Sequence, residues 1–144
     1  MLLGEYEHTL DDKNRLTLPA KFRRVFEDGC VVARGFDGCL SAWTPEGWAS
    51  YQESTLSTLN LLSREGRQLH RYFFSGATDT TPDRQGRVLI PPTLLTHAKL
   101  GRDVVVAGVN DHLEIWDRDA WRRELSEVEG SAEDVAERLA AQGS

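Results

Sequence analysis

Two stretches of the chain follow one pattern, Asp11-Asp12-Lys13-Asn14-Arg15-Leu16-Thr17-Leu18-Pro19 and Asp83-Arg84-Gln85-Gly86-Arg87-Val88-Leu89-Ile90-Pro91. In each, aspartate comes first, arginine follows four residues later, and proline ends the stretch. Asn14 and Gly86 stand just before the arginine, and both residue types tolerate left-handed backbone. The pattern predicts a tight turn and a short strand in each half, with the proline opening a helix.

The two stretches belong to a longer internal repeat with an offset of 72 residues. The other matches are Gly4 with Gly76, Thr9 with Thr81, Gly29 with Gly101 and, after one extra residue, Val32 with Val105, Gly35 with Gly108, Leu40 with Leu113, Trp43 with Trp116 and Trp48 with Trp121. The repeat predicts a first module at 5–47, a helical connection at 48–75, a second module at 76–119 and an acidic tail, helical or frayed, at 120–144.

Each module is expected to fold as two strands, a helix and two strands. The helix of the first copy has an apolar face and a basic face, formed by Phe22, Val25 and Phe26 on one side and Lys21, Arg23 and Arg24 on the other. Gly29 and Gly101 suit the ends of the two helices. Modules of about 43 residues are too small to bury an adequate core alone, so we expect the copies to share strands.

The segments outside the modules have helical patterns. Apolar residues at three- and four-residue steps predict helix from Pro45 to Phe74, with a break near 63–66. In the tail, Ser131 and Asp134 have the spacing of a capping box, but the apolar line of Val135 and Leu139 is thin. We expect a marginal helix there.

Composition excludes several classes of protein. Of 144 residues, 40% are hydrophobic and 28% charged, and the mean hydropathy is −0.45, which does not fit a disordered or membrane-embedded chain. The sequence shows no secretory signal pattern, and the spacing of Cys30 and Cys39 fits neither a disulfide framework nor a zinc ligand pair. These features predict a protein of the reduced cytoplasm without a membrane partner.

Charge is unevenly distributed along the chain. The net charge of −6 arises in residues 111–144, which carry ten acidic and four basic residues, whereas residues 1–110 carry 13 of each. No acidic residue interrupts the segments Lys13 to Arg24 and Arg84 to Arg102, so each can form a local basic patch on an acidic protein.

The paired motifs resemble those of a known family. Met1 to Phe22, with Gly4-Glu5-Tyr6 and the first stretch, resembles the start of MraZ proteins, and the second stretch resembles that family's second module. The resemblance covers about residues 1–125. It implies an α+β, mainly β fold of two tandem SpoVT/AbrB-type ββαββ modules in a pseudo-symmetric swapped-hairpin barrel, assembled into rings. The family pattern is Asp-x-x-Gly-Arg, and Asn14 replaces its glycine in the first copy.

Function follows from the same resemblance and from arginine chemistry. The resemblance implies a nucleoid-associated transcriptional regulator, in the repressor class, of the division and cell-wall gene cluster. Arg15 and Arg87 are candidates for reading guanine, because a guanidinium can donate two hydrogen bonds to the O6 and N7 atoms. The candidates for phosphate contacts are Lys13, Lys21, Arg23, Arg24, Arg84 and Lys99. Asn14 and Gly86 are further DNA-binding candidates, and Asp11 and Asp83 shape the turns.

Other interpretations stay open. Arg15 and Arg87 could instead form surface ion pairs with Asp11 and Asp83, and Arg23 with Arg24 could be a solvated helix face. Candidate contacts between subunits are Trp48, Leu56, Tyr72, Phe73 and Phe74, which could equally belong to the core. The chain could also be a ring-forming scaffold whose basic patches bind an acidic partner.

An enzyme is the least favoured class. The sequence has no nucleophile elbow or phosphate loop, and its four histidines lack ligand spacing, so we predict no catalytic residue, metal or cofactor. We interpret Cys39 as a small buried hydrophobe and Trp43 and Trp116 as core or subunit contacts. The leading hypothesis is a DNA-binding regulator that acts on direct repeats in promoter DNA as a homo-oligomeric ring.

Overall fold

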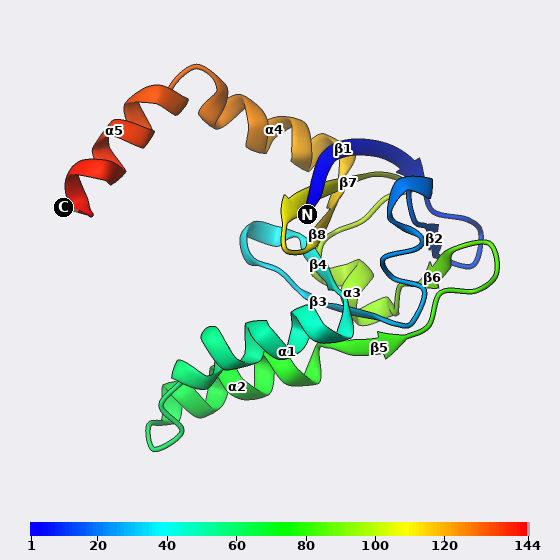
Figure 1. The fold of residues 1–144 in the computed structure, drawn as a ribbon, viewed down its shortest axis with the longest axis horizontal. Helices are drawn as coiled ribbons and strands as arrows, with labels where there is room; N and C mark the ends of the chain where they lie inside the picture. Colours follow the sequence, from blue (N-terminus) through cyan, green and yellow to red (C-terminus); the bar gives the residue numbers. More distant parts are fainter. Residues whose placement is uncertain (144) are drawn as a thin grey trace.

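Six strands of three to eight residues pair into an antiparallel sheet at the centre of the protein (Figure 1). The computed structural model describes residues 1–143. The strand order is β1-β7-β8-β4-β3-β5, and β2 and β6 form a separate two-stranded ribbon. The strands are β1 (Leu2–Thr9), β2 (Arg15–Thr17), β3 (Cys30–Arg34), β4 (Leu40–Trp43), β5 (Thr78–Thr80), β6 (Arg87–Leu89), β7 (Asp103–Asn110) and β8 (Leu113–Asp117). The predicted mixed α/β character with sheet predominant is confirmed.

Strands from the two halves of the chain are interleaved. The first strand of one half pairs with the third of the other, β1 with β7 and β5 with β3, and β4 pairs with β8. In the ribbon, Arg15 lies opposite Leu89 and Thr17 opposite Arg87, so equivalent positions are related as by a two-fold axis. The halves share strands, as the small size of each repeat predicts.

The core lies between the sheet and the segments that follow the two prolines. Phe22 and Phe26 from the first half and Leu94 from the second are fully buried with Leu16 and Val88 of the ribbon. Burial of large apolar side chains is the dominant favourable term in folding, so the ribbon is fixed to the sheet by its inner face.

The segment after Pro19 departs from the prediction of an α-helix. It forms only a 3₁₀ turn, η1 (Ala20–Phe22), followed by irregular turns, and Val25 is 49% exposed rather than on an apolar face. The equivalent segment does form a helix, α3 (Pro92–His97). The left-handed residue that ends α3 is Lys99 (φ 49°), and Gly101 has no positive φ. Gly29 has φ 154°, which is not the left-handed helical conformation, and it follows turns and not an α-helix, so neither glycine ends a helix as predicted.

The connection is a helical hairpin. α1 (Pro45–Ser54) and α2 (Arg64–Ser75) are joined through η3 (Leu56–Thr58), so the break lies at 55–63, earlier than predicted. Thr44 and Ser63 end the loops before these helices, and their side chains accept hydrogen bonds from Gly47 N and Gly66 N. Figure 1 shows the hairpin projecting from the sheet.

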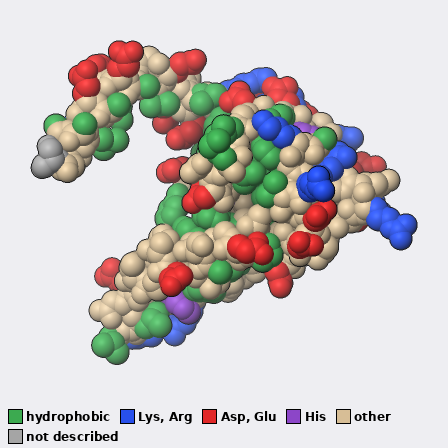
Figure 2. Space-filling view, viewed as in Figure 1, with side chains coloured by type: hydrophobic (Ala, Val, Ile, Leu, Met, Phe, Trp, Pro, Cys, Tyr) green, Lys and Arg blue, Asp and Glu red, His purple; other side chains and the backbone are tan. Residues whose placement is uncertain are grey.

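The tail forms two helices, α4 (Arg118–Glu129) and α5 (Ala132–Gln142). Asp117 caps α4 by accepting from Ala120 N, but Ser131 makes no side-chain cap, so the predicted capping box does not form. Together the helices make an arm that leaves the sheet beside β1, on the opposite side of the molecule from β2 and β6 (Figure 1). Acidic residues gather on the outer side of this arm (Figure 2).

Candidate nucleic-acid interface

The two predicted turns form and have the same hydrogen bonds. In the first, Asp11 Oδ1 accepts from Lys13 N (2.9 Å) and Arg15 N (2.8 Å), and Asn14 N donates to the Asp11 carbonyl (3.0 Å). In the second, Asp83 Oδ1 accepts from the equivalent backbone groups at 3.0 and 2.9 Å, and Gly86 N donates to the Asp83 carbonyl (2.9 Å). Local side-chain to backbone bonds of this kind are what favour aspartate at turns.

Left-handed backbone closes both turns. Asn14 has φ 59° and Gly86 φ 76°, so asparagine keeps the conformation that the glycine has in the second copy. The prediction that the turn survives this substitution is confirmed.

Each aspartate also pairs with the arginine four residues later. Arg15 Nε lies 2.7 Å from Asp11 Oδ2, and Arg87 Nε lies 2.7 Å from Asp83 Oδ2. The backbone N–H of each arginine, then the guanidinium itself, lowers the pKa of its aspartate below the ordinary value, although residual desolvation opposes this shift. The pairs therefore stay charged at neutral pH.

Ion pairs with aspartate are the alternative prediction for Arg15 and Arg87. Forming them does not prevent either arginine from also binding a ligand. The hydrogen bond in each pair uses Nε, and among the described residues no bond is made by either terminal nitrogen. The terminal nitrogens carry four of the five N–H donors of a guanidinium. The aspartate therefore orients the arginine side chain and leaves its two terminal nitrogens available to donate hydrogen bonds to a ligand.

The ribbon places both arginines on one exposed face. Leu16 and Val88 point inward and are 0% and 1% exposed. Because side chains alternate along a strand, Arg15 and Arg87 lie on the outer face, with their cross-strand neighbours Leu89 and Thr17. The turn carbonyls hold the ribbon ends, because Asn14 O accepts from Ile90 N (3.0 Å) and Gly86 O from Leu18 N (2.8 Å). The two arginines thus project from a rigid support.

Further basic side chains surround this face unequally. Arg23, Arg24 and Arg84 line a groove of about 540 Å³ beside the second turn, together with Asp83 and Gly86. Arg23 Nε donates to the Leu18 carbonyl (3.1 Å), so this arginine braces the ribbon as well. Lys13 and Lys21 are exposed, and Lys99 is exposed at the end of α3.

Arg102 belongs to the basic segment Arg84 to Arg102 but is not among the predicted phosphate contacts, and Thr17 and Leu89 are not predicted on this face. Arg102, whose carbonyl accepts from Leu10 N (2.9 Å), lies beside the first turn and approaches Asp12 at 3.7 Å. Thr17 and Leu89 share the outer face with the arginines. The register of β2 with β6 places Thr17 and Leu89 on this face, and the sequence of one three-residue strand does not predict that register.

The proposed subunit contacts occupy different environments. Leu56 and Phe73 are only 4% and 8% exposed and belong to the interior of the protomer, whereas Tyr72 is 42% exposed. Trp48 and Phe74 are half-buried and meet edge to face at 6.0 Å. Trp43 and Trp116 are buried at 4% each, which fits their interpretation as core residues.

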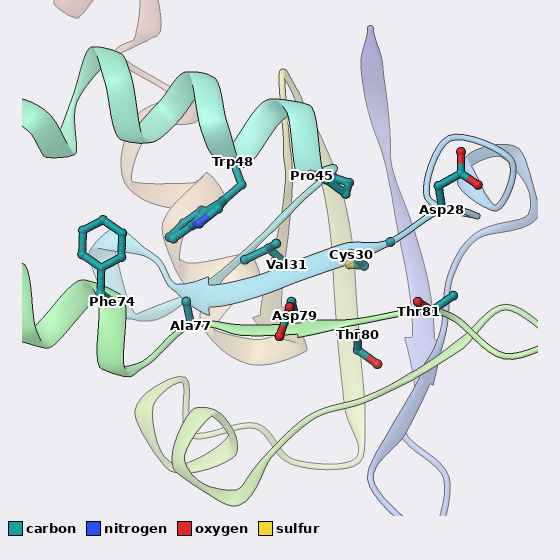
Figure 3. Close-up of a pocket in the computed structure, with 11 residues that line it drawn as sticks. Asp28, Cys30, Val31, Pro45, Trp48, Phe74, Ala77, Asp79, Thr80 and Thr81 are labelled. Atoms are coloured by element: carbon teal, nitrogen blue, oxygen red, sulfur yellow. The ribbon is translucent and has the colours of Figure 1, made fainter.

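A cavity of about 480 Å³ lies between α1, α2, β3 and β5 (Figure 3). Trp48 and Phe74 line one end, Asp79 lies in the middle, and Asp28 and Thr81 line the other end (Figure 3). Burial raises the pKa of the Cys30 thiol in its wall to about 12, so that thiol stays protonated at neutral pH and is a poor nucleophile. Burial likewise raises the pKa of Cys39, which is fully buried as expected.

Residues 1–143 contain no group of three or more His, Cys, Asp or Glu side chains placed to hold a metal ion. Within the same range, none of the helices has the length and apolar character needed to span a bilayer.

The geometry defines a class of protein that presents paired arginines on a β-ribbon, and the relatives of this chain are transcriptional regulators. The family model "MraZ protein, putative antitoxin-like" matches residues 1–71 and 73–142. Proteins named "Transcriptional regulator MraZ" from Roseiflexus sp. (strain RS-1) and Ligilactobacillus salivarius (strain UCC118) are 47% and 45% identical over 97% and 96% of both chains. That from Thermoanaerobacter pseudethanolicus (strain ATCC 33223 / 39E) is 41% identical over 96% of both. The chain belongs to the MraZ family of transcriptional regulators.

Proposed function

We propose that this protein is a sequence-specific regulator that binds double-stranded DNA through the outer face of the β2–β6 ribbon. The carrying observation is that Arg15 and Arg87 occupy diagonal positions on this one face, each held by an aspartate through Nε alone. The major groove admits a two-stranded ribbon, and arginine is the commonest reader of guanine there.

The surrounding charges fit phosphate contacts on either side of the groove. Arg23, Arg24 and Arg84 flank the second turn, and Lys13 and Arg102 flank the first. Such contacts fix the position of a protein on a duplex without reading its sequence. The acidic total charge does not oppose binding, because the whole excess of −6 arises in residues 111–144 and residues 1–110 are neutral overall.

The ribbon and the interleaved strands support a tandem arrangement of two SpoVT/AbrB-type modules, at 5–47 and 76–119, in a swapped-hairpin barrel. The equivalent residues Leu16 and Val88 face one another in β2–β6, and Leu40 and Leu113 take equivalent places in β4–β8. One such barrel offers two arginines, which read few base pairs. We therefore propose a homo-oligomeric ring that grips several direct repeats at once, so that weak contacts add.

The cellular role proposed here follows family membership. The protein acts in the cytoplasm at the nucleoid, as a repressor of the division and cell-wall gene cluster. The relatives are named transcriptional regulators, and that naming supports a role in transcription.

The test is a gel-shift titration with DNA from upstream of the protein's own gene. Arg15→Ala and Arg87→Ala are each expected to weaken binding by about 1–3 kcal/mol per engaged arginine, and the double variant by more. Arg123→Ala, on exposed α4, is the matched control and should bind as the wild type does. Sequence-specific binding by a double variant that keeps its oligomeric mass would contradict the assignment.

A salt titration separates DNA reading from general capture of acidic partners. A specific regulator should prefer its own duplex over unrelated DNA and over heparin, with affinity that falls steeply as salt rises. Equal affinity for every polyanion would favour the alternative, a scaffold whose basic patches bind an acidic partner.

A further inference from the structure

One large apolar side chain stands on the outer face of the ribbon. Leu89 is 54% exposed, although it belongs to a strand whose other face is fully buried. Its partner across the ribbon is Arg15. Cβ atoms of directly opposite residues in an antiparallel pair lie about 4.5–5.5 Å apart, so the two side chains leave the ribbon as neighbours.

We infer that Leu89 contacts the 5-methyl group of a thymine in the major groove, next to the base that Arg15 reads; the inference rests on the proposed DNA binding. Thymine is the only base that presents a methyl group in that groove, and apolar side chains recognise it by contact. Successive base pairs along one strand are about 3.4 Å apart, so neighbouring side chains on a ribbon reach neighbouring bases. Burying Leu89 against a methyl group also removes an exposed apolar surface from water.

The equivalent position in the first half carries Thr17, opposite Arg87. Threonine offers one methyl group on a shorter side chain and adds a hydroxyl, so its apolar contact is smaller. The two ends of the ribbon are therefore chemically different, although their arginines and turns match.

This difference bears on the direction in which the protein reads DNA. A ribbon with identical halves would read both strands alike and would fit a palindrome equally well in either orientation. Leu89 at one end and Thr17 at the other distinguish the two orientations. Leu89 thus acts as a specificity residue that favours a site with a polarity, which is what a direct repeat requires.

The experiment compares DNA from upstream of the protein's own gene with the same duplex in which deoxyuridine replaces every thymidine. The replacement removes the methyl groups and keeps base pairing. Wild-type protein should bind the deoxyuridine duplex more weakly by about 3- to 4-fold per contacted methyl group. Leu89→Ala should bind ordinary DNA with a similar loss and should respond much less to the replacement. Val128→Ala, an exposed apolar residue on α4, is the matched control and should keep the wild-type response.

The outcomes separate the two proposals. Equal binding of both duplexes by the wild type, with preference over unrelated DNA retained, would overturn the role of Leu89 and leave the proposed function standing. An unchanged response to deoxyuridine in Leu89→Ala would also overturn it, because effects of the replacement on DNA shape act on both proteins. Loss of sequence preference in the wild type itself would instead refute the proposed function, and the inference with it. Circular dichroism melting of Leu89→Ala checks that the exposed side chain is not needed for folding.

Discussion

Asn14 and Gly86 hold equivalent places in the two turns, but their surroundings differ. A Cβ atom at Gly86 would lie 2.8 Å from Arg23 Cδ and 2.9 Å from its Nε. The residue equivalent to Arg23 in the second half is Leu95, so the first turn has no arginine in that place. The second turn needs glycine because Arg23 fills the space, in addition to its positive φ.

We predict that Gly86→Asn lowers the free energy of unfolding by about 1–2 kcal/mol, through overpacking against Arg23. The reverse exchange, Asn14→Gly, should change it by less than about 0.5 kcal/mol. Urea unfolding followed by tryptophan fluorescence measures both. In an Arg23→Ala background the effect of Gly86→Asn should shrink, and additive effects of the two changes would contradict the explanation.

His112 is held between two carboxylates and an aromatic ring. Its Nδ1 lies 2.7 Å from Asp111 Oδ1 and its Nε2 3.6 Å from Glu114 Oε2, and its ring stacks on Trp43 at 4.3 Å. Burial acts to lower the pKa of His112, but hydrogen bonds to Glu114 and Asp111 together outweigh it and raise the pKa above 6.5. The hydrogen bond from His112 is also the main cause that lowers the pKa of Glu114.

The raised pKa of His112 gives a stability difference that depends on pH. Folding favours the protonated His112 ring, so the ring's contribution to the free energy of unfolding is complete below pH 6.5. That contribution is lost as the pH rises through the pKa of His112 in the folded state. We predict that His112→Gln loses about 1–2 kcal/mol of unfolding free energy at pH 5.5 and less at pH 8.5. Paired urea titrations of wild type and variant test this, with His70→Gln, whose ring meets Phe74, as the control. A loss that is greater at pH 8.5 would contradict the sign.

The two helices of the arm differ, because α4 contacts the sheet through polar side chains and α5 buries no residue. Trp121 Nε1 donates to Glu5 Oε2 (3.1 Å), and Arg118 and Arg122 approach Glu7 at 3.9 and 3.7 Å. No residue of α5 is buried. The end of α4 and all of α5 therefore add little apolar burial to the fold.

We predict that removing residues 126–144 leaves the fold and the oligomer intact and keeps or raises DNA affinity at low salt. The removed segment is acidic, and Figure 1 places it away from β2 and β6, so its effect on binding should be modest and should vanish as salt screens it. Melting temperature, sedimentation and gel shift measure the three properties. Loss of folding would show that the arm is a packed element, and loss of the oligomer alone would assign assembly to it.

Predictability from sequence differed among elements for a physical reason. The turns could be predicted because their bonds are local, from Asp11 or Asp83 to backbone two and four residues on. The segment after Pro19 could not, because Phe22 and Phe26 suit helical spacing but are equally well buried from a 3₁₀ turn and irregular backbone. Ser131 has a capping-box spacing, but spacing does not ensure that the side chain bonds the backbone.

The small size of each repeat predicts that the two halves share strands, but it does not predict which strands pair with each other. β1 pairs with β7 about one hundred residues later, and no local pattern specifies such a register. The residues on the outer face of the ribbon likewise could not all be predicted, because strand pairing decides which of them are neighbours. Arg15 and Arg87 could be nominated from the repeat, whereas Leu89 became a candidate only when pairing placed it beside Arg15.

The α1–α2 hairpin has an exposed apolar tip that suits a contact between subunits. Leu62 is 94% exposed and Leu61 48%, with Leu69 and Tyr72 exposed at 46% and 42% along α2. A projecting element that meets a different surface on the next subunit makes a heterologous contact, which closes into a ring when the rotation permits. Subunits arranged in one sense along a duplex read direct repeats, whereas an isolated two-fold dimer reads an inverted repeat. We therefore expect a particle well above dimer mass in sedimentation and a DNA footprint over at least two direct repeats. Leu62→Glu should reduce the mass without lowering the melting temperature, whereas Leu139→Glu on α5, 60% exposed, should not. A monomer or dimer that protects a single palindrome would contradict the ring and the direct repeats together.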